Sequence, residues 1–314
     1  MTASSHVKFA TKGGVVLEFG MQLPVQAQSK LMAQPWEEKA GPAEIAAVAA
    51  ACDRNGFSYV GVCDHVAVPR PLAPRMTTIW YDTVATLSWL AAQTEHVKLL
   101  SHVYVLAYRH PLVTAKAFMT LDVLSGGRAI LGVGAGHAEG EFVALGVPFS
   151  ERGRRTDEAI GVIRASFADE WGAGDVGQAP RPVQPGGPPI WVGGSSRSAL
   201  LRAARLGDGW LPQGPPEMGM EAAIGLLRDT REQAGRADSP FVVGGGFSYY
   251  LGSAGWDIPE WTVRGEPEKV AEQLAAQAAI GVTHVMVRPP SSSADELIDQ
   301  IDAFGQQVMP LVRS

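Results

Sequence analysis

Short apolar runs bounded by glycine or proline alternate along the chain with longer segments in which apolar residues recur every three or four positions. The short runs have the length and composition of strands, and the longer segments have the period of helices. This alternation is typical of βα units. The candidate strands are residues 15–24, 57–63, 97–106, 128–134, 189–194, 208–212, 241–251 and 283–289. The candidate helices are residues 43–54, 82–93, 111–124, 152–170, 197–206, 219–234, 267–280 and 294–309.

Eight strands that are each followed by a helix predict a (β/α)8 TIM barrel. A chain of 314 residues, 46% of them apolar, is long enough for one barrel or for two ordinary domains. A doubly wound sheet would need a second domain, and the spacing of elements shows no break at which it could start. The Pro/Gly-rich tract 172–189 is the one long loop, although a linker would have the same composition. We therefore predict a single domain over residues 1–314.

Charge and cysteine content exclude several classes of protein. A net charge of −6 leaves no basic surplus for nucleic acid, and no Lys/Arg block indicates an anionic membrane. No uninterrupted apolar segment is long enough for a membrane helix, and residues 1–14 contain no apolar run of signal-peptide length. Cys52 and Cys63 lie in apolar segments without ligand-like spacing, so we expect no metal site and a reducing, cytoplasmic location.

Polar residues follow several of the predicted strands, where a barrel places its chemistry. Asp64 and His65 come directly after strand 57–63; there a carboxylate can orient an imidazole, which can exchange a proton near neutral pH. The structural alternative is a turn cap and a hydrogen-bonded rim histidine. His102 lies inside an apolar strand, and periodicity alone indicates a structural histidine. Further strand-end candidates are Gly134, Gly136, His137, Glu139, Gly193, Gly194, Ser195, Ser196, Gln213 and Gly214.

Two glycine-rich turns are candidates for binding phosphate. Gly193 and Gly194 precede a helix whose N-terminus would face an anion, and Ser195 and Ser196 could add hydroxyl donors. A plain βα turn with Ser196 as N-cap has the same letters. Glycines also alternate at Gly132, Gly134 and Gly136, but a dinucleotide-binding fingerprint needs the spacing G-x-G-x-x-G on the first βα unit. That second interpretation therefore fails on spacing and on place.

Three longer motifs carry a family resemblance: "YRHPLVTAKAFMTLDVLSGGRAILGVGAG", "PIWVGGSSRSALLRAARLGDGWLP" and "RGEPEKVAEQLAAQAAIGVTHVMVR". Together they resemble the luciferase-like monooxygenase superfamily, specifically its coenzyme F420-dependent branch, from about Val15 to Pro310. The resemblance implies a TIM barrel of the bacterial luciferase type that binds a flavin or deazaflavin in its mouth, and a homodimer.

The resemblance also implies roles for individual residues. Asp64 and His65 would flank the deazaflavin ring, with His65 as general acid or base. His102 and Val103 match a bulge that often carries a non-prolyl cis peptide bond behind the ring. Residues matched to the loop along the cofactor are Gly134, Gly136 and Gly140, and those matched to its phosphate end are Gly193, Gly194, Ser195 and Ser196. Gln213 and Gly214, at the end of the next strand, complete the predicted cofactor site.

The sequence departs from the family pattern at two places. His137 stands where relatives frequently have tryptophan or glutamate; it could donate a proton, bind substrate or fill space. The stretch between Trp171 and Pro182 is shorter than usual, which suggests a more open mouth or a bulkier substrate. Aromatic and methionine side chains of the pocket loops indicate an apolar, small-molecule substrate: Trp80, Tyr81, Met218, Met220, Tyr249, Tyr250 and Trp256.

The resulting prediction is an F420-dependent oxidoreductase. C5 of the deazaflavin gives or takes a hydride, while His65, or in second place His137, moves a proton on the substrate. An FMN-dependent monooxygenase with the same barrel is the alternative within the enzyme class. A cofactor-binding barrel without turnover is the alternative outside it.

Overall fold

The predicted strands close into one parallel barrel in the computed structural model, which describes residues 16–27, 29–30 and 33–313. β3 pairs with β2 on one side and β5 on the other, so the ring is complete, and every pairing between its strands is parallel. The barrel strands are β1 (Glu18–Gln22), β2 (Tyr59–Val62), β3 (Lys98–Ser101) with its continuation β4 (Tyr104–Val105), β5 (Ala129–Gly134), β6 (Ile190–Gly193), β7 (Gly209–Leu211), β8 (Val242–Phe247) and β11 (His284–Val287). The TIM barrel predicted from the sequence is confirmed.

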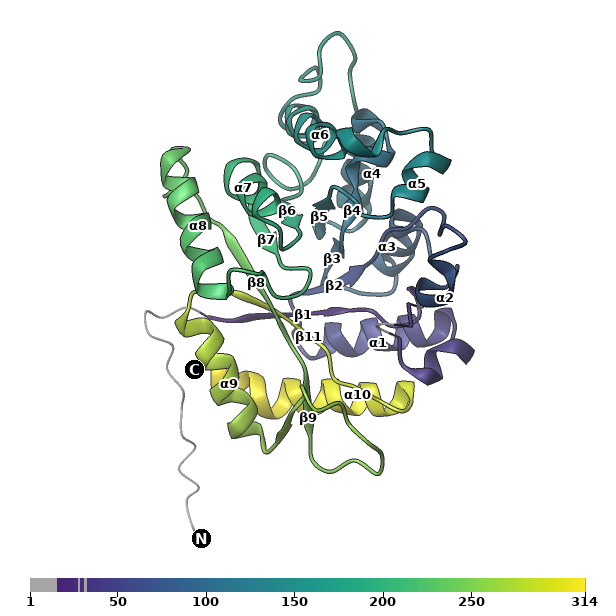
Figure 1. Cartoon of the computed structure of the whole chain (residues 1–314), viewed down its shortest axis with the longest axis vertical. Coiled ribbons are helices and arrows are strands. Elements are labelled where there is room, and N and C mark those ends of the chain that lie inside the picture. Colours follow the sequence, from purple (N-terminus) through teal and green to yellow (C-terminus); the bar gives the residue numbers. More distant parts are fainter. Residues whose placement is uncertain (1–15, 28, 31–32, 314) are drawn as a thin grey trace.

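Helices surround the strands and cover their outer face (Figure 1). The longer ones are α1 (Pro42–Arg54), α3 (Thr83–Ala91), α4 (Pro111–Leu124), α6 (Arg152–Ala168), α7 (Arg197–Leu206), α8 (Met220–Gln233), α9 (Pro267–Ala279) and α10 (Ala294–Ala303). Short elements lie in the connections: η1 (Pro35–Lys39), α2 (Ala73–Met76), η2 (Leu106–Tyr108), α5 (Glu139–Ala144), η3 (Phe149–Glu151), the π-helical turn η4 (Phe304–Val308) and α11 (Met309–Val312). Asp82 and Ser196 cap α3 and α7, since their side chains accept hydrogen bonds from the backbone N–H groups of Ala85 and Ala199.

Large side chains fill the interior of the barrel. Tyr59, Leu100 and Trp191 belong to one buried cluster inside it. Their bulk requires a glycine opposite, because a Cβ at Gly20 would lie 2.1 Å from the Tyr59 ring. The barrel is therefore a packed core, and ligands are left to its mouth.

Three predicted elements differ from the observed ones. The strand predicted over 97–106 is interrupted between β3 and β4, at a cis peptide bond that joins His102 to Val103. The strand predicted over 241–251 is divided: β9 (Tyr249–Leu251) pairs outside the barrel with β10 (Val263–Gly265), which the sequence analysis missed. The helix predicted over 294–309 is α-helical only as far as Ala303, and the π-helical turn η4 follows it. Non-local pairing, which local periodicity does not report, decides the second case.

No helix in the described part of the chain has both the length and the apolar character needed to cross a bilayer. Residues 1–14, on which the prediction about a signal peptide rested, lie outside the described residues.

Candidate active site

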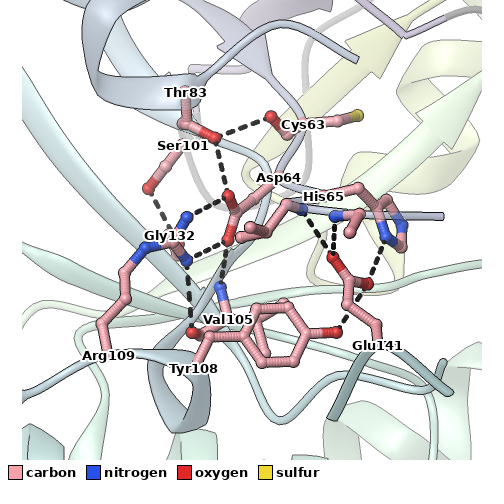
Figure 2. A network of polar contacts seen from close by, with 12 residues as sticks. Cys63, Asp64, His65, Thr83, Ser101, Val105, Tyr108, Arg109, Gly132 and Glu141 are labelled. Atoms are coloured by element: carbon pink, nitrogen blue, oxygen red, sulfur yellow. Dashed lines mark hydrogen bonds and ion pairs between the residues drawn. The ribbon is translucent and has the colours of Figure 1, made fainter. Parts of the chain in front are cut away.

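Asp64, two residues after the end of β2, joins this strand to the segment after β3. Its carboxylate oxygens accept hydrogen bonds from the Arg109 guanidinium at 2.7 and 2.8 Å (Figure 2). The backbone N–H of Val105 donates to Oδ2 at 2.8 Å, and the Thr83 hydroxyl donates to Oδ1 at 3.2 Å. Because 2% of the Asp64 side chain is exposed, this is a buried ion pair. Both oxygens are thus bonded within the protein, and a direct contact between Asp64 and a cofactor stays a prediction.

His65 is held by a carboxylate other than Asp64. Its Nδ1 lies 2.8 Å from Oε2 of Glu141, a residue of α5 (Figure 2). Trp80 contacts one side of the imidazole, with ring centroids 4.3 Å apart, and the His137 ring lies 5.6 Å away and nearly perpendicular. The sequence analysis expected Asp64 to be the orienting group; the structure assigns this contact to Glu141.

Glu141 is fully buried and accepts four hydrogen bonds. The Tyr108 hydroxyl donates to the oxygen that His65 also contacts, at 2.8 Å, and the backbone N–H groups of Val66 and Ala67 donate to the other oxygen. Burial alone would raise the pKa of Glu141, but the hydrogen bonds from His65, Ala67 and Tyr108 outweigh burial and hold the pKa below its ordinary value. Glu141 is therefore an ionised acceptor beneath His65.

His137 is exposed at the rim of the barrel mouth. Its pKa is lowered, first by loss of hydration among its neighbours and then by the nearby His65. The structure thus brings the two candidate proton-transfer groups side by side and favours a neutral His137 at physiological pH.

His102 precedes the cis peptide bond that the family resemblance implies, and the bond is present. One ring nitrogen, Nε2, lies 3.0 Å from the side-chain nitrogen of Gln213. The other, Nδ1, is buried and has no hydrogen-bond partner among the described residues. Burial, followed by the charge of Arg288, lowers the pKa of His102 to about 4. A neutral imidazole with an unsatisfied nitrogen therefore stands at the end of β3.

The side chain of Val103 gives a packing reason for glycine at two of the positions predicted to contact the cofactor, Gly134 and Gly193. A Cβ at Gly134 would lie 2.6 Å from one methyl of Val103, and a Cβ at Gly193 would lie 2.6 Å from the other. Both glycines therefore leave room for this side chain. Gly136 and Gly140 are confined similarly, against Phe142 and Pro69 respectively. Contacts of these glycines with a cofactor stay predictions.

The predicted phosphate turn leads from β6 into α7. Ser196 caps the helix, and the Ser195 hydroxyl bonds the backbone of Gly214 and Gln213, so both hydroxyls already have partners in the protein. The first N–H groups of a helix have no partner within it, and the dipole favours an anion there. Gly194 turns the chain with φ +121°, a conformation that suits glycine.

These features fit a cofactor with a polar ring and a phosphate. The buried Nδ1 of His102 offers a polar contact at the mouth, and the start of α7 offers backbone donors to an anion. Among the described residues, no group of three His, Cys, Asp or Glu side chains could hold a metal ion.

Three contributors to the site were missed from the sequence: Arg109, Tyr108 and Glu141. Glu139 was the carboxylate chosen in α5, but it is exposed, whereas Glu141 faces inward beside buried Phe142.

Two expectations about the lining of the pocket are wrong. The pocket-lining role predicted for Tyr249 fails because this residue is fully buried and donates to the backbone of Gln300. Tyr250 is buried too and donates to Glu296.

Comparison with known proteins places the fold among characterised enzymes. Residues 17–254 match the family model described as luciferase-like monooxygenase. An FMNH2-dependent dimethylsulfone monooxygenase of Pseudomonas putida is 26% identical, over 83% of this chain and 85% of its own length. An F420-dependent glucose-6-phosphate dehydrogenase of Kineococcus radiotolerans is 27% identical, over 88% and 95% respectively.

Solved structures show the same fold. The F420-dependent tetrahydromethanopterin reductase of Methanopyrus kandleri superposes with a TM-score of 0.73 at 20% identity, over 94% of this chain and 99% of that one. A monooxygenase of Streptomyces bottropensis gives a TM-score of 0.75 at 21% identity, with the same coverage.

Proposed function

The chain belongs to the luciferase-like monooxygenase family, and on this premise we propose that it is a coenzyme F420-dependent oxidoreductase. A hydride passes between C5 of the deazaflavin and a small organic substrate, and His65 moves the accompanying proton. The observation that carries the proposal is the setting of His65, whose Nδ1 is bonded to a buried carboxylate beside Trp80 and His137. Such a histidine can accept or donate a proton at its other nitrogen.

The protein's part in this reaction is to bind and to orient. We assign the deazaflavin ring to the segment around His102 and Val103. There the buried Nδ1 of the His102 imidazole has no hydrogen-bond partner among the described residues. When bound, the deazaflavin supplies two-electron hydride chemistry at C5. The residues that we assign to the rest of the cofactor are Gly134, Gly136, Gly140, Gly193, Gly194, Ser195, Ser196, Gln213 and Gly214.

FMN is the alternative cofactor, because the turn before α7 suits the phosphate of either molecule and one relative is named as FMNH2-dependent. A titration of the purified protein with each oxidised cofactor, followed by visible absorbance, separates the two. We expect saturable binding of F420 at lower concentration than FMN. Tight binding of FMN with no binding of F420 would exclude the deazaflavin and favour a monooxygenase.

The role of His65 is tested by His65→Ala. Removing a general acid or base lowers a rate by about 10²–10⁴-fold, so we expect a loss of kcat in this range with F420 affinity retained. His96→Ala is the matched control, because His96 is an exposed histidine away from the candidate site. A His65→Ala enzyme with undiminished hydride transfer would remove His65 from the mechanism.

The substrate is sought by screening small alcohols, aldehydes and enones for a change in F420 absorbance. Saturable binding of F420 without oxidation or reduction of any substrate would favour the non-catalytic barrel. We keep the apolar substrate, the homodimer and the cytoplasmic location as predictions; light scattering of the purified protein tests the dimer.

A further inference from the structure

The contacts of Glu141 fix which nitrogen of His65 carries a proton. Besides His65, the groups bonded to Glu141 are the Tyr108 hydroxyl and the backbone N–H groups of Val66 and Ala67. The two N–H groups can only donate, and the hydroxyl donates here. Three donors converge on this carboxylate, and they stabilise its ionised form, which agrees with the lowered pKa of Glu141.

An ionised carboxylate accepts hydrogen bonds and donates none. The 2.8 Å contact between Nδ1 of His65 and Glu141 is therefore a bond in which Nδ1 carries the hydrogen. In a neutral imidazole only one nitrogen is protonated, so Nε2 then has a free lone pair. No described residue hydrogen-bonds Nε2, and it is not among the buried atoms that lack a partner.

The imidazole is also restrained mechanically. Trp80 and His137 flank it, and 9% of the side chain is exposed. A ring flip that would turn Nε2 toward Glu141 has to displace these neighbours and break the bond to the carboxylate. The geometry thus presents one nitrogen to Glu141 and leaves the other for a ligand.

We propose that Glu141 is a positioning residue that holds neutral His65 as the Nδ1–H tautomer and so presets Nε2 as the proton acceptor of the reaction. This inference rests on the proposed function, in which His65 moves the proton. With F420 bound as the hydride acceptor, Nε2 of His65 would accept the O–H proton of an alcohol that is oxidised, and in the reverse direction it would return a proton to the carbonyl oxygen. The imidazolium formed at His65 stays paired with Glu141.

The tautomer is measured directly by two-bond ¹H–¹⁵N correlation NMR of protein labelled with ¹⁵N-histidine, without cofactor or substrate. His65→Ala identifies the signal of His65. At a pH where His65 is neutral, we expect Nδ1 to be protonated in the natural protein. Protonation at Nε2 would overturn the proposal whatever any variant does.

Glu141→Gln tests the consequence. The amide can donate to Nδ1, which stabilises the opposite tautomer, with the proton on Nε2. We expect the Nε2–H signal to appear and kcat/KM to fall by about 10²-fold or more, the order seen when an orienting carboxylate is lost.

Glu139→Gln is the matched control, since it makes the same change two residues away on an exposed position of α5. We expect the Nδ1–H signal and full activity in this variant. A Glu141→Gln protein that binds F420 normally and keeps both the Nδ1–H signal and the natural kcat/KM would refute the positioning role. If His65→Ala instead retains full turnover, the proposed function fails, while the NMR result on the free protein still decides the tautomer.

Discussion

Asp64→Asn tests whether the carboxylate after β2 is a structural clamp. The substitution keeps the shape of the side chain and an oxygen for the Val105 N–H, but removes the charge opposite Arg109. Deleting one partner of a buried ion pair costs about 3–5 kcal/mol, because the other charge is left uncompensated. Here 16% of the Arg109 side chain is exposed, and its guanidinium lies 3.9 Å from the Tyr104 ring centre, so part of the charge remains solvated or stacked. We therefore expect a loss near the lower end, about 3 kcal/mol of unfolding free energy.

Urea unfolding followed by tryptophan fluorescence and by far-UV circular dichroism measures this loss, provided that both probes report one transition. Asp229→Asn makes the same change in a surface pair whose carboxylate side chain is 59% exposed, and should cost less than about 1 kcal/mol. Adding Arg109→Met to Asp64→Asn should recover part of the loss, because the stranded charge is gone. An Asp64→Asn protein within about 1 kcal/mol of the natural one would refute the clamp.

Two further predictions concern the barrel. Gly134→Ala should lower the free energy of unfolding by about 1–3 kcal/mol, since the new Cβ would meet Val103 at 2.6 Å. Gly161→Ala, in the open on α6, should raise it by about 0.5–1 kcal/mol; equal thermal stability of the two variants would contradict this account. Acid should weaken the fold through His102 and His284, whose pKa burial lowers to about 4. Because the unfolded value is about 6.5, the unfolded state binds more protons between these limits, and stability falls there by about 1.4 kcal/mol per pH unit for each histidine. Urea titrations from pH 7 to 4 measure the slope, and His284→Gln should make it shallower.

The barrel was predictable because each of its strands is a short apolar run bounded by turn residues, a signal that local sequence contains. The run Ala129–Gly134 is apolar and bounded by turn residues, and the structure keeps it as β5, buried throughout. β10 is different: its three residues, Val263–Gly265, have no alternation to detect and form a strand only because Tyr249–Leu251 lies beside them. Pairing between distant segments, rather than propensity, creates such elements.

The candidate site divides in the same way. His65 was predictable because it follows a strand, and strand ends form the mouth of a barrel. Glu141 and Arg109 were not, because their importance depends on which side chain each meets across 76 and 45 residues of sequence. No local signal singled out Glu141: Val143 is also next to Phe142 in this six-residue helix, and it is 73% exposed.

Two buried carboxylates tie the loop after β2 to one short segment. Asp64 is bonded to Val105 and Arg109, while Glu141 is bonded to His65 and Tyr108. The three partners outside the loop, Val105, Tyr108 and Arg109, lie within four residues of one another, around η2. That segment directly follows the cis peptide bond at Val103. The position of His65 relative to the end of β3 is therefore set by both carboxylates, and Asp64 can affect catalysis without contacting a cofactor. A lower kcat at unchanged F420 affinity in Asp64→Asn would support this indirect role, whereas weaker F420 binding at unchanged kcat would favour direct contact with the ring.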